Sequence, residues 1–154
     1  MAYKITENCT GCTACTKRCP VVAITGDRNL LHVIDPVTCI DCGACGYVCP
    51  DSAIHDETGE LAAALKAKER PKAYVIEAAC TGCEWCVDSC PFDALQMVES
   101  PQPDNFKGIV QVIDKKCVGC KLCEWDCPYE AIFVWRQDKV APEVLAQITV
   151  SKAA

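Results

Sequence analysis

The chain has 154 residues, a formal net charge of −6 and sixteen cysteines. The negative charge disfavours nucleic acid as a partner, because phosphate groups would be repelled, and no apolar run approaches the length of about 18 residues that a membrane span needs. No apolar signal segment follows Met1, so we expect a reducing, cytoplasmic location.

All sixteen cysteines fall into four copies of one motif, Cys-x2-Cys-x2-Cys-x3-Cys-Pro. The copies occupy residues 9–20, 39–50, 80–91 and 117–128. This spacing is typical of 4Fe–4S cubane ligation, in which three cysteines of one loop bind one cluster and the fourth binds the other cluster of the pair. The motif therefore predicts metal-binding cysteines in all four copies.

Two other uses of the cysteines remain open. An even number of cysteines permits disulfides, but disulfide frameworks are typical of secreted domains. Structural zinc is the stronger alternative, because Cys-x2-Cys is also a zinc-binding pair, although a longer loop usually separates the two pairs of a zinc site. Iron, sulfide and zinc analysis would distinguish these possibilities.

Short strand candidates flank each pair of motifs, so each half is predicted to run strand, motif, hairpin, motif, strand. The expected strands are 2–6, 31–35, 53–56, 73–77, 95–98, 109–114 and 131–135. Each motif continues as Pro-x-x-Ala followed by Ile or Leu, and we expect this aliphatic residue to open a strand. Residues 26–29 predict a tight hairpin turn, whereas residues 99–108 predict a longer loop that is either solvated or contacts a partner.

Two segments outside the motifs are predicted to be helical. Residues 57–70 contain Leu61-Ala-Ala-Ala-Leu65 and precede Pro71, which favours a helical connector over residues 57–72. In the C-terminal tail, 136–154, a proline begins the segment 142–148 and favours a short helix whose apolar side packs on this chain or on a partner.

Each pair of motifs spans only about 50–60 residues, a size at which apolar burial alone gives little stability. Cluster binding is therefore expected to be coupled to folding, so that the metal-free chain is largely unfolded. Residues 73–135 carry a net charge of −6 and residues 1–56 a net charge of −2. The second half is thus either the docking face for a basic partner or simply a solubilising surface.

Residues 1–56 resemble a bacterial (clostridial) two-cluster ferredoxin from Tyr3-Lys-Ile to Ser52-Ala-Ile, and residues 73–135 resemble a second copy with a longer hairpin. The resemblance covers roughly four fifths of the chain. It implies an α+β fold with two ferredoxin-like iron–sulfur domains, each with short antiparallel hairpins and short helices around two 4Fe–4S clusters.

The resemblance also implies four ligand sets. They are Cys9, Cys12, Cys15 and Cys49 for cluster one; Cys39, Cys42, Cys45 and Cys19 for cluster two; Cys80, Cys83, Cys86 and Cys127 for cluster three; and Cys117, Cys120, Cys123 and Cys90 for cluster four. Iron–sulfur subunits of molybdenum oxidoreductases instead pair the first motif with the last. The gap of 19 residues between Cys19 and Cys39 favours pairing of adjacent motifs.

These features predict an electron-transfer polyferredoxin without a substrate site of its own, and hence not an enzyme. The chain is similar in size and motif content to four-cluster small subunits of bacterial tungsten-dependent aldehyde oxidoreductases. That similarity implies a tungsten or molybdenum catalytic subunit and a second redox subunit, such as a flavoprotein, as partners. A free soluble ferredoxin serving several enzymes is the alternative, and an end-to-end multimer is a third possibility.

Several single residues carry weaker predictions. Trp85 and Trp125 either pack internally or, with the tail, form an apolar rim for a partner. Lys121 should favour reduction of cluster four, and Asp41 should disfavour reduction of cluster two. His32 and His55 are expected to be surface or strand residues rather than ligands.

Overall fold

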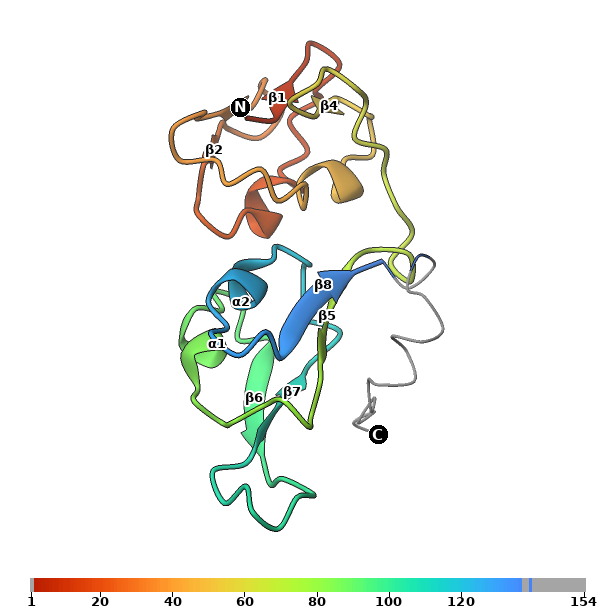
Figure 1. The fold of residues 1–154 in the computed structure, drawn as a ribbon. Coiled ribbons are helices and arrows are strands. Elements are labelled where there is room, and N and C mark those ends of the chain that lie inside the picture. Colours follow the sequence, from red (N-terminus) through yellow and green to blue (C-terminus); the bar gives the residue numbers. More distant parts are fainter. Residues whose placement is uncertain (1, 137–138, 140–154) are drawn as a thin grey trace. The chain divides into compact units, whose positions relative to one another are not determined.

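The computed structural model describes residues 2–136 and 139, and the chain divides into two compact units, Met1–Arg70 and Pro71–Ala154 (Figure 1). Each unit contains two of the four cysteine motifs. None of the helices in the described part of the chain is long and apolar enough to cross a bilayer. The tail segment 142–148, for which the sequence predicts a helix, lies outside the described residues.

The first unit consists of two short antiparallel strand pairs and two single-turn helices. Its elements are β1 (Lys4–Ile5), the 3-10 helix η1 (Thr16–Arg18), β2 (Ile24–Thr25), β3 (Val33–Ile34), the 3-10 helix η2 (Gly46–Val48) and β4 (Ile54–His55). β1 pairs with β4, and β2 pairs with β3. The chain therefore returns beside its own start, with a hairpin between the two motifs.

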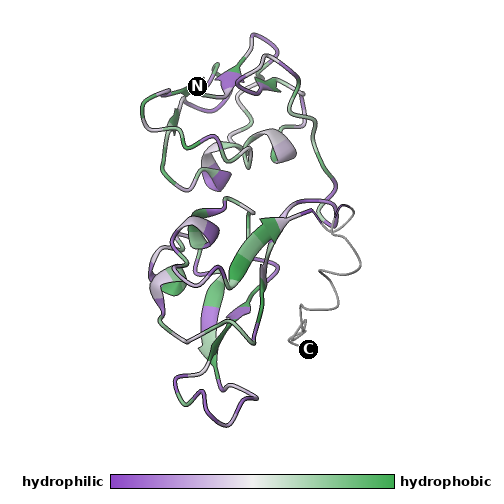
Figure 2. Ribbon diagram, in the orientation of Figure 1, coloured by the Kyte–Doolittle hydropathy of each residue, from purple (hydrophilic) through white to green (hydrophobic). Residues whose placement is uncertain are grey.

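The second unit repeats this arrangement with longer strands. Its elements are β5 (Lys72–Val75), α1 (Trp85–Asp88), β6 (Leu95–Val98), β7 (Ile109–Val112), α2 (Leu122–Trp125) and β8 (Ile132–Trp135). β5 pairs with β8 and β6 with β7, both antiparallel. β8 is hydrophobic along most of its length (Figure 2), and Phe133 stacks on Tyr74 across the β5–β8 pair at 6.0 Å between ring centroids.

The strand predictions from the Pro-x-x-Ala-(Ile/Leu) repeat are confirmed. The aliphatic residues that open the strands are Ile24 in β2, Ile54 in β4, Leu95 in β6 and Ile132 in β8. Each of these four side chains is buried. The aliphatic residue thus begins a strand because it enters the core directly after the turn that follows the fourth cysteine.

The predicted helix over residues 57–70 is wrong, because this stretch forms turns at 57–59 and 67–70 with irregular backbone between them and belongs to the first unit. Gly59 makes a turn with φ of +88°, after which the amide of Ala62 donates to the carbonyl of Ile54 at 2.9 Å. The amide of Leu65 then donates to the carbonyl of Tyr47 at 3.0 Å. Hydrogen bonds to the edge of β4 and to η2 replace those of a helix, so tertiary pairing overrides the helix propensity of the alanine run.

The apolar core of each unit is small and contains cysteines. In the first unit Cys15, Cys45 and Cys49 are buried together with Ile24, Ile34 and Ile54. In the second unit Cys86, Cys117 and Cys123 are buried among aliphatic side chains of all four strands. Thiols thus occupy the positions that aliphatic side chains fill in an ordinary core.

Candidate iron–sulfur centres

In each unit, three cysteines of the first motif and the fourth cysteine of the second motif meet around a small cavity. Cys9, Cys12, Cys15 and Cys49 line such a cavity in the first unit, with about 290 Å³ of space that is partly open to solvent. Cys80, Cys83, Cys86 and Cys127 line the corresponding cavity of the second unit, with about 310 Å³. Residues about 40 positions apart in the chain are therefore neighbours in both units.

The complementary sets also come together. Cys19 of the first motif joins Cys39, Cys42 and Cys45 of the second around a cavity of about 310 Å³. In the second unit, Cys117, Cys120, Cys86 and Cys90 all lie close enough to Cys123 to raise its pKa electrostatically, so the fourth cysteine of the first motif is again near cysteines of the second. The neighbours of every fourth cysteine thus include cysteines of the other motif of its unit, which is the arrangement that pairing of adjacent motifs requires.

The loop of each motif is curled by two left-handed residues, one on each side of the second cysteine. These residues are Gly11 and Thr13, Asp41 and Gly43, Gly82 and Glu84, and Gly119 and Lys121, with φ between +53° and +74°. Such turns point successive backbone N–H groups inward, and the amide of Gly11 lies 3.4 Å from the Sγ of Cys9. The x2 spacing therefore gives a short concave loop with its sulfurs on the inner side.

Close backbone packing explains why three of the four motifs have glycine before the second cysteine. A Cβ at Gly11 would lie 2.4 Å from the amide nitrogen of Leu30, and a Cβ at Gly119 would lie 2.5 Å from the carbonyl oxygen of Pro71. Asp41 occupies the same position in the second motif, with φ of +53°, and is exposed. A position with left-handed backbone therefore accepts a non-glycine residue when its side chain has room. It requires glycine where a neighbouring strand or loop fills the space that a Cβ would occupy.

The alanine of each Pro-x-x-Ala segment donates a hydrogen bond to the fourth cysteine. The amides of Ala23, Ala53, Ala94 and Ala131 lie 3.2, 3.3, 3.4 and 3.3 Å from the Sγ atoms of Cys19, Cys49, Cys90 and Cys127. The residue before each alanine is left-handed, with φ between +48° and +55°. The turn after the proline thus supplies an N–H donor to a sulfur, and donors of this kind stabilise negative charge on a ligand set.

Burial keeps the third cysteine of each motif protonated in the absence of metal. It raises the pKa of Cys15 to about 11 and the pKa values of Cys45 and Cys86 to about 12, and neighbouring thiols add to each increase. Burial also raises the pKa of Cys123. A metal must therefore displace protons to bind here, so these thiols suit ligation better than nucleophilic attack at neutral pH.

The donor chemistry fits an iron–sulfur cubane. All sixteen cysteines lie in the described part of the chain and each is a free thiol, so the disulfide alternative has no support. Among residues 2–136 and 139, no three or more His, Cys, Asp or Glu side chains converge on a point where they could hold a single metal ion. A cubane does not require such convergence, because each thiolate binds a different iron.

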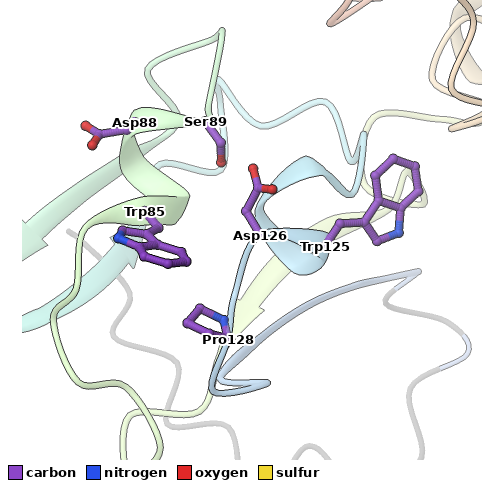
Figure 3. Close-up of a pocket in the computed structure, with 6 residues that line it drawn as sticks. All are labelled: Trp85, Asp88, Ser89, Trp125, Asp126 and Pro128. Atoms are coloured by element: carbon purple, nitrogen blue, oxygen red, sulfur yellow. The ribbon is translucent and has the colours of Figure 1, made fainter.

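An open groove lies between α1 and α2 of the second unit. It is lined by Trp85, Asp88, Ser89, Trp125, Asp126 and Pro128. Figure 3 shows Ser89 and Asp126 facing the space between the helices, Trp85 near Pro128, and Trp125 on the other side of α2. Trp85 is 60% exposed and Trp125 is 56% exposed, so neither indole belongs to the buried core.

The long loop of the second unit is anchored beside a cysteine motif. The side-chain amide of Asn105 donates to the carbonyl of Cys80 at 2.9 Å, although Phe106 next to it is 91% exposed. The segment 99–108 therefore combines an internal anchor with an exposed tip.

His32 is a site residue that sequence reasoning missed. It was expected on the surface or in a strand, but it precedes β3, is only 1% exposed and lines the cavity of Cys9, Cys12, Cys15 and Cys49. In the structure His32 and Ile34, two residues apart, are both buried and Val33 between them is exposed, but the sequence around His32 shows no alternation of polar and apolar residues that predicts this side. His55 lies in β4, as expected.

Comparison with known proteins agrees with this geometry. Three family models, each described as a 4Fe-4S dicluster domain, match overlapping parts of the chain, over residues 8–54, 32–97 and 79–131. The "Ferredoxin 7Fe" of Hydrogenibacillus schlegelii is 51% identical over 59 residues, which cover 37% of this chain and 74% of that protein. "Ferredoxin-2" of Chlorobaculum tepidum is 43% identical over 60 residues, which cover 35% of this chain and 95% of that protein.

Two larger proteins are also similar to the chain. The mitochondrial "Pyruvate dehydrogenase [NADP(+)]" of Euglena gracilis is 34% identical over 79 residues, which cover 42% of this chain and 4% of that protein. A solved chain of a formate dehydrogenase–heterodisulfide reductase–formylmethanofuran dehydrogenase complex from Methanospirillum hungatei is 27% identical, with a TM-score of 0.38. The match covers 82% of this chain and 52% of that chain.

The folds, the cysteine sets and the similarity to ferredoxins define an electron-transfer iron–sulfur protein with tandem dicluster domains. The chain belongs to the family of 4Fe-4S dicluster ferredoxins.

Proposed function

We propose that the chain carries four 4Fe–4S clusters and acts as the electron-wire subunit of a multi-subunit oxidoreductase. Bound clusters would supply the one-electron redox chemistry. The observation that carries the proposal is the meeting of three cysteines from one motif with the fourth cysteine of its neighbour, seen around three cavities. Sixteen cysteines in four such sets match four clusters without remainder.

The proposed ligands are the four sets that the sequence predicts. In these sets the fourth cysteine of each motif binds the cluster of the other motif in its unit, and this cross-ligation can be tested by substitution. Cys49→Ser should remove the cluster of the first motif, and Cys19→Ser the cluster of the second. Each variant should lose about four of about sixteen iron atoms per chain. Zinc in place of iron and sulfide in the native protein would contradict the proposal.

The residues around the cysteine sets suit electron transfer and do not form a substrate site in the proposed role. With clusters bound, the backbone amides that donate to the fourth cysteines would stabilise the negative charge added on reduction. Buried aliphatic side chains such as Ile54 and Ile132 shield the cysteine sets from water. We therefore assign catalysis to a partner, proposed to be a tungsten or molybdenum aldehyde oxidoreductase subunit, with a flavoprotein as a second redox partner.

The groove between α1 and α2 supports a subunit rather than a freely diffusing ferredoxin. Its exposed Trp85 and its acidic residues Asp88 and Asp126 have the composition of a docking surface for a partner with apolar and basic groups. Trp85→Ala should weaken the complex and slow electron transfer from the partner. Trp135→Ala, at the end of β8 and outside the groove, is the matched control.

A free carrier that serves several enzymes is the second candidate. It is favoured by the similarity to "Ferredoxin-2", because nearly all of that ferredoxin aligns with a segment that makes up 35% of this chain. Purification from the source organism under native, anaerobic conditions distinguishes the two. A stable complex supports the subunit, whereas a lone monomer that reduces several enzymes supports the carrier. Light scattering of the purified chain tests the end-to-end multimer.

A further inference from the structure

His32 has one polar atom that the protein leaves without a partner. Its Nδ1 lies 3.0 Å from the carbonyl oxygen of Leu30. A carbonyl only accepts hydrogen bonds, so Nδ1 carries a hydrogen and donates it. The other ring nitrogen, Nε2, is the buried side-chain polar atom without a hydrogen-bond partner in the described part of the chain. Buried polar groups normally have partners, so an unpartnered nitrogen on a cavity wall points to a ligand in that cavity.

The imidazole ring is held in place from behind. Gly26, with φ of +145°, lies against it so closely that a Cβ there would be 2.8 Å from the Cγ of His32. The hydrogen bond to Leu30 holds one edge of the ring. Nε2 therefore cannot easily turn away to find another partner, and its place on the wall of the cavity is built into the hairpin.

The second unit lacks this polar group at the equivalent position. His32 stands seven residues before Cys39, and Val110 stands seven residues before Cys117. Each lines the cavity formed by the three first-motif cysteines of its unit. Both side chains are buried, at 1% and 3% exposure. The two cavities thus differ at one matched wall position, which is polar in the first unit and aliphatic in the second.

We propose that His32 donates a hydrogen bond from Nε2 to a sulfur atom of the cluster bound by Cys9, Cys12, Cys15 and Cys49, and thereby raises the reduction potential of that cluster above that of its counterpart in the second unit. This inference rests on the proposed function, because it requires a 4Fe–4S cluster in that set. Thiolate and sulfide sulfurs are acceptors, so the ring nitrogen facing them must carry a hydrogen.

The resulting contact is charge-assisted. Since Nδ1 already donates to Leu30, a ring that also donates from Nε2 carries a positive charge. A buried cation needs a negative partner, and a cubane with four thiolates is negative. The added electron strengthens this attraction, so His32 favours the reduced form. Val110 offers no such contact, and electrons shared between the two centres therefore favour the first unit.

The test is the reduction potential of each cluster in the full chain, followed by EPR during anaerobic redox titration. His32→Val reproduces the wall of the second unit. We expect it to lower the equilibrium constant for reducing one cluster by about tenfold, which is about 59 mV for a one-electron couple, and to leave the others unchanged. Ile5→Val alters the same wall without a polar atom and should leave all potentials unchanged.

Two further variants test the proposal if the His32→Val protein fails to fold and bind its clusters. His32→Gln keeps an N–H donor without the charge and should give a smaller decrease. Val110→His places the polar group in the second unit and should raise the potential of a different cluster. Unchanged potentials in His32→Val or His32→Gln, at full iron content, overturn the role of His32 but leave the four-cluster function intact. A wild-type chain without iron would instead refute the proposed function.

Discussion

Two glycines with similar left-handed backbone but different surroundings separate the cost of backbone strain from the cost of close packing. Gly11 has φ of +70° and Gly59 has φ of +88°. An alanine at either position must adopt a conformation that costs L-residues about 1–2 kcal/mol. Around Gly59 nothing lies within 4 Å of an added Cβ, so Gly59→Ala should cost this strain alone.

Gly11→Ala should cost considerably more. Its Cβ would lie 2.4 Å from the amide nitrogen and 2.5 Å from the carbonyl oxygen of Leu30, and neither backbone atom can rotate away. Forcing extra atoms into a packed site adds about 1–3 kcal/mol, which gives a total of about 2–5 kcal/mol. The shift should also disturb the loop of Cys9, and with it one cluster.

Anaerobic urea titration of the cluster-containing protein, followed by visible absorbance, measures both effects. Gly59→Ala should lower the midpoint slightly and keep full iron content. Gly11→Ala should lower the midpoint at least twice as far and lose about four iron atoms per chain. Equal midpoints for the two variants, both with full iron, would refute the argument that neighbouring backbone rather than φ demands glycine in the motif.

Three other substitutions test the packing around the cysteine sets. Gly46→Ala would bring a Cβ within 2.4 Å of the side chain of Ala62; it should cost about 1–3 kcal/mol and speed proteolysis within 57–70, and an unchanged digestion pattern would contradict this. Asn105→Ala removes the hydrogen bond to the carbonyl of Cys80 and should cost about 1 kcal/mol in urea unfolding, so unchanged stability would mean that the loop is not anchored. Ile54→Ala, at 1% exposure, should cost about 2–5 kcal/mol in the same assay, and a loss below 1 kcal/mol would show that this wall collapses around the gap.

The strands were predictable because their signal is local. β2, β4, β6 and β8 follow from an aliphatic residue at a fixed distance after a proline turn, the other strands from short β-branched and aromatic runs, and the longer hairpin of the second unit from its loop composition. The role of His32 was not predictable, because apolar residues flank it on both sides and give no alternation. In addition, a cavity and an unpartnered nitrogen exist only once the hairpin is folded against the first motif.

The connector shows where local reasoning fails. The alanine run from Leu61 to Leu65 favours a helix by propensity, but Ala62 and Leu65 give their amides to Ile54 and Tyr47 instead. These hydrogen bonds to residues earlier in the chain form only after the first unit has folded. They outweigh the small helix propensity of a short alanine segment.

The sequence by itself determined the chemistry of this protein. The spacing of sixteen cysteines predicts iron–sulfur ligation, and the repeat predicts two related units, because ligand spacing and strand periodicity are short-range properties of the chain. Tertiary structure decided which thiols meet around each cavity, which glycines have no room for a Cβ, and which histidine faces a cysteine set. These depend on distances between segments about 20 to 40 residues apart, and such distances arise only when the strands pair.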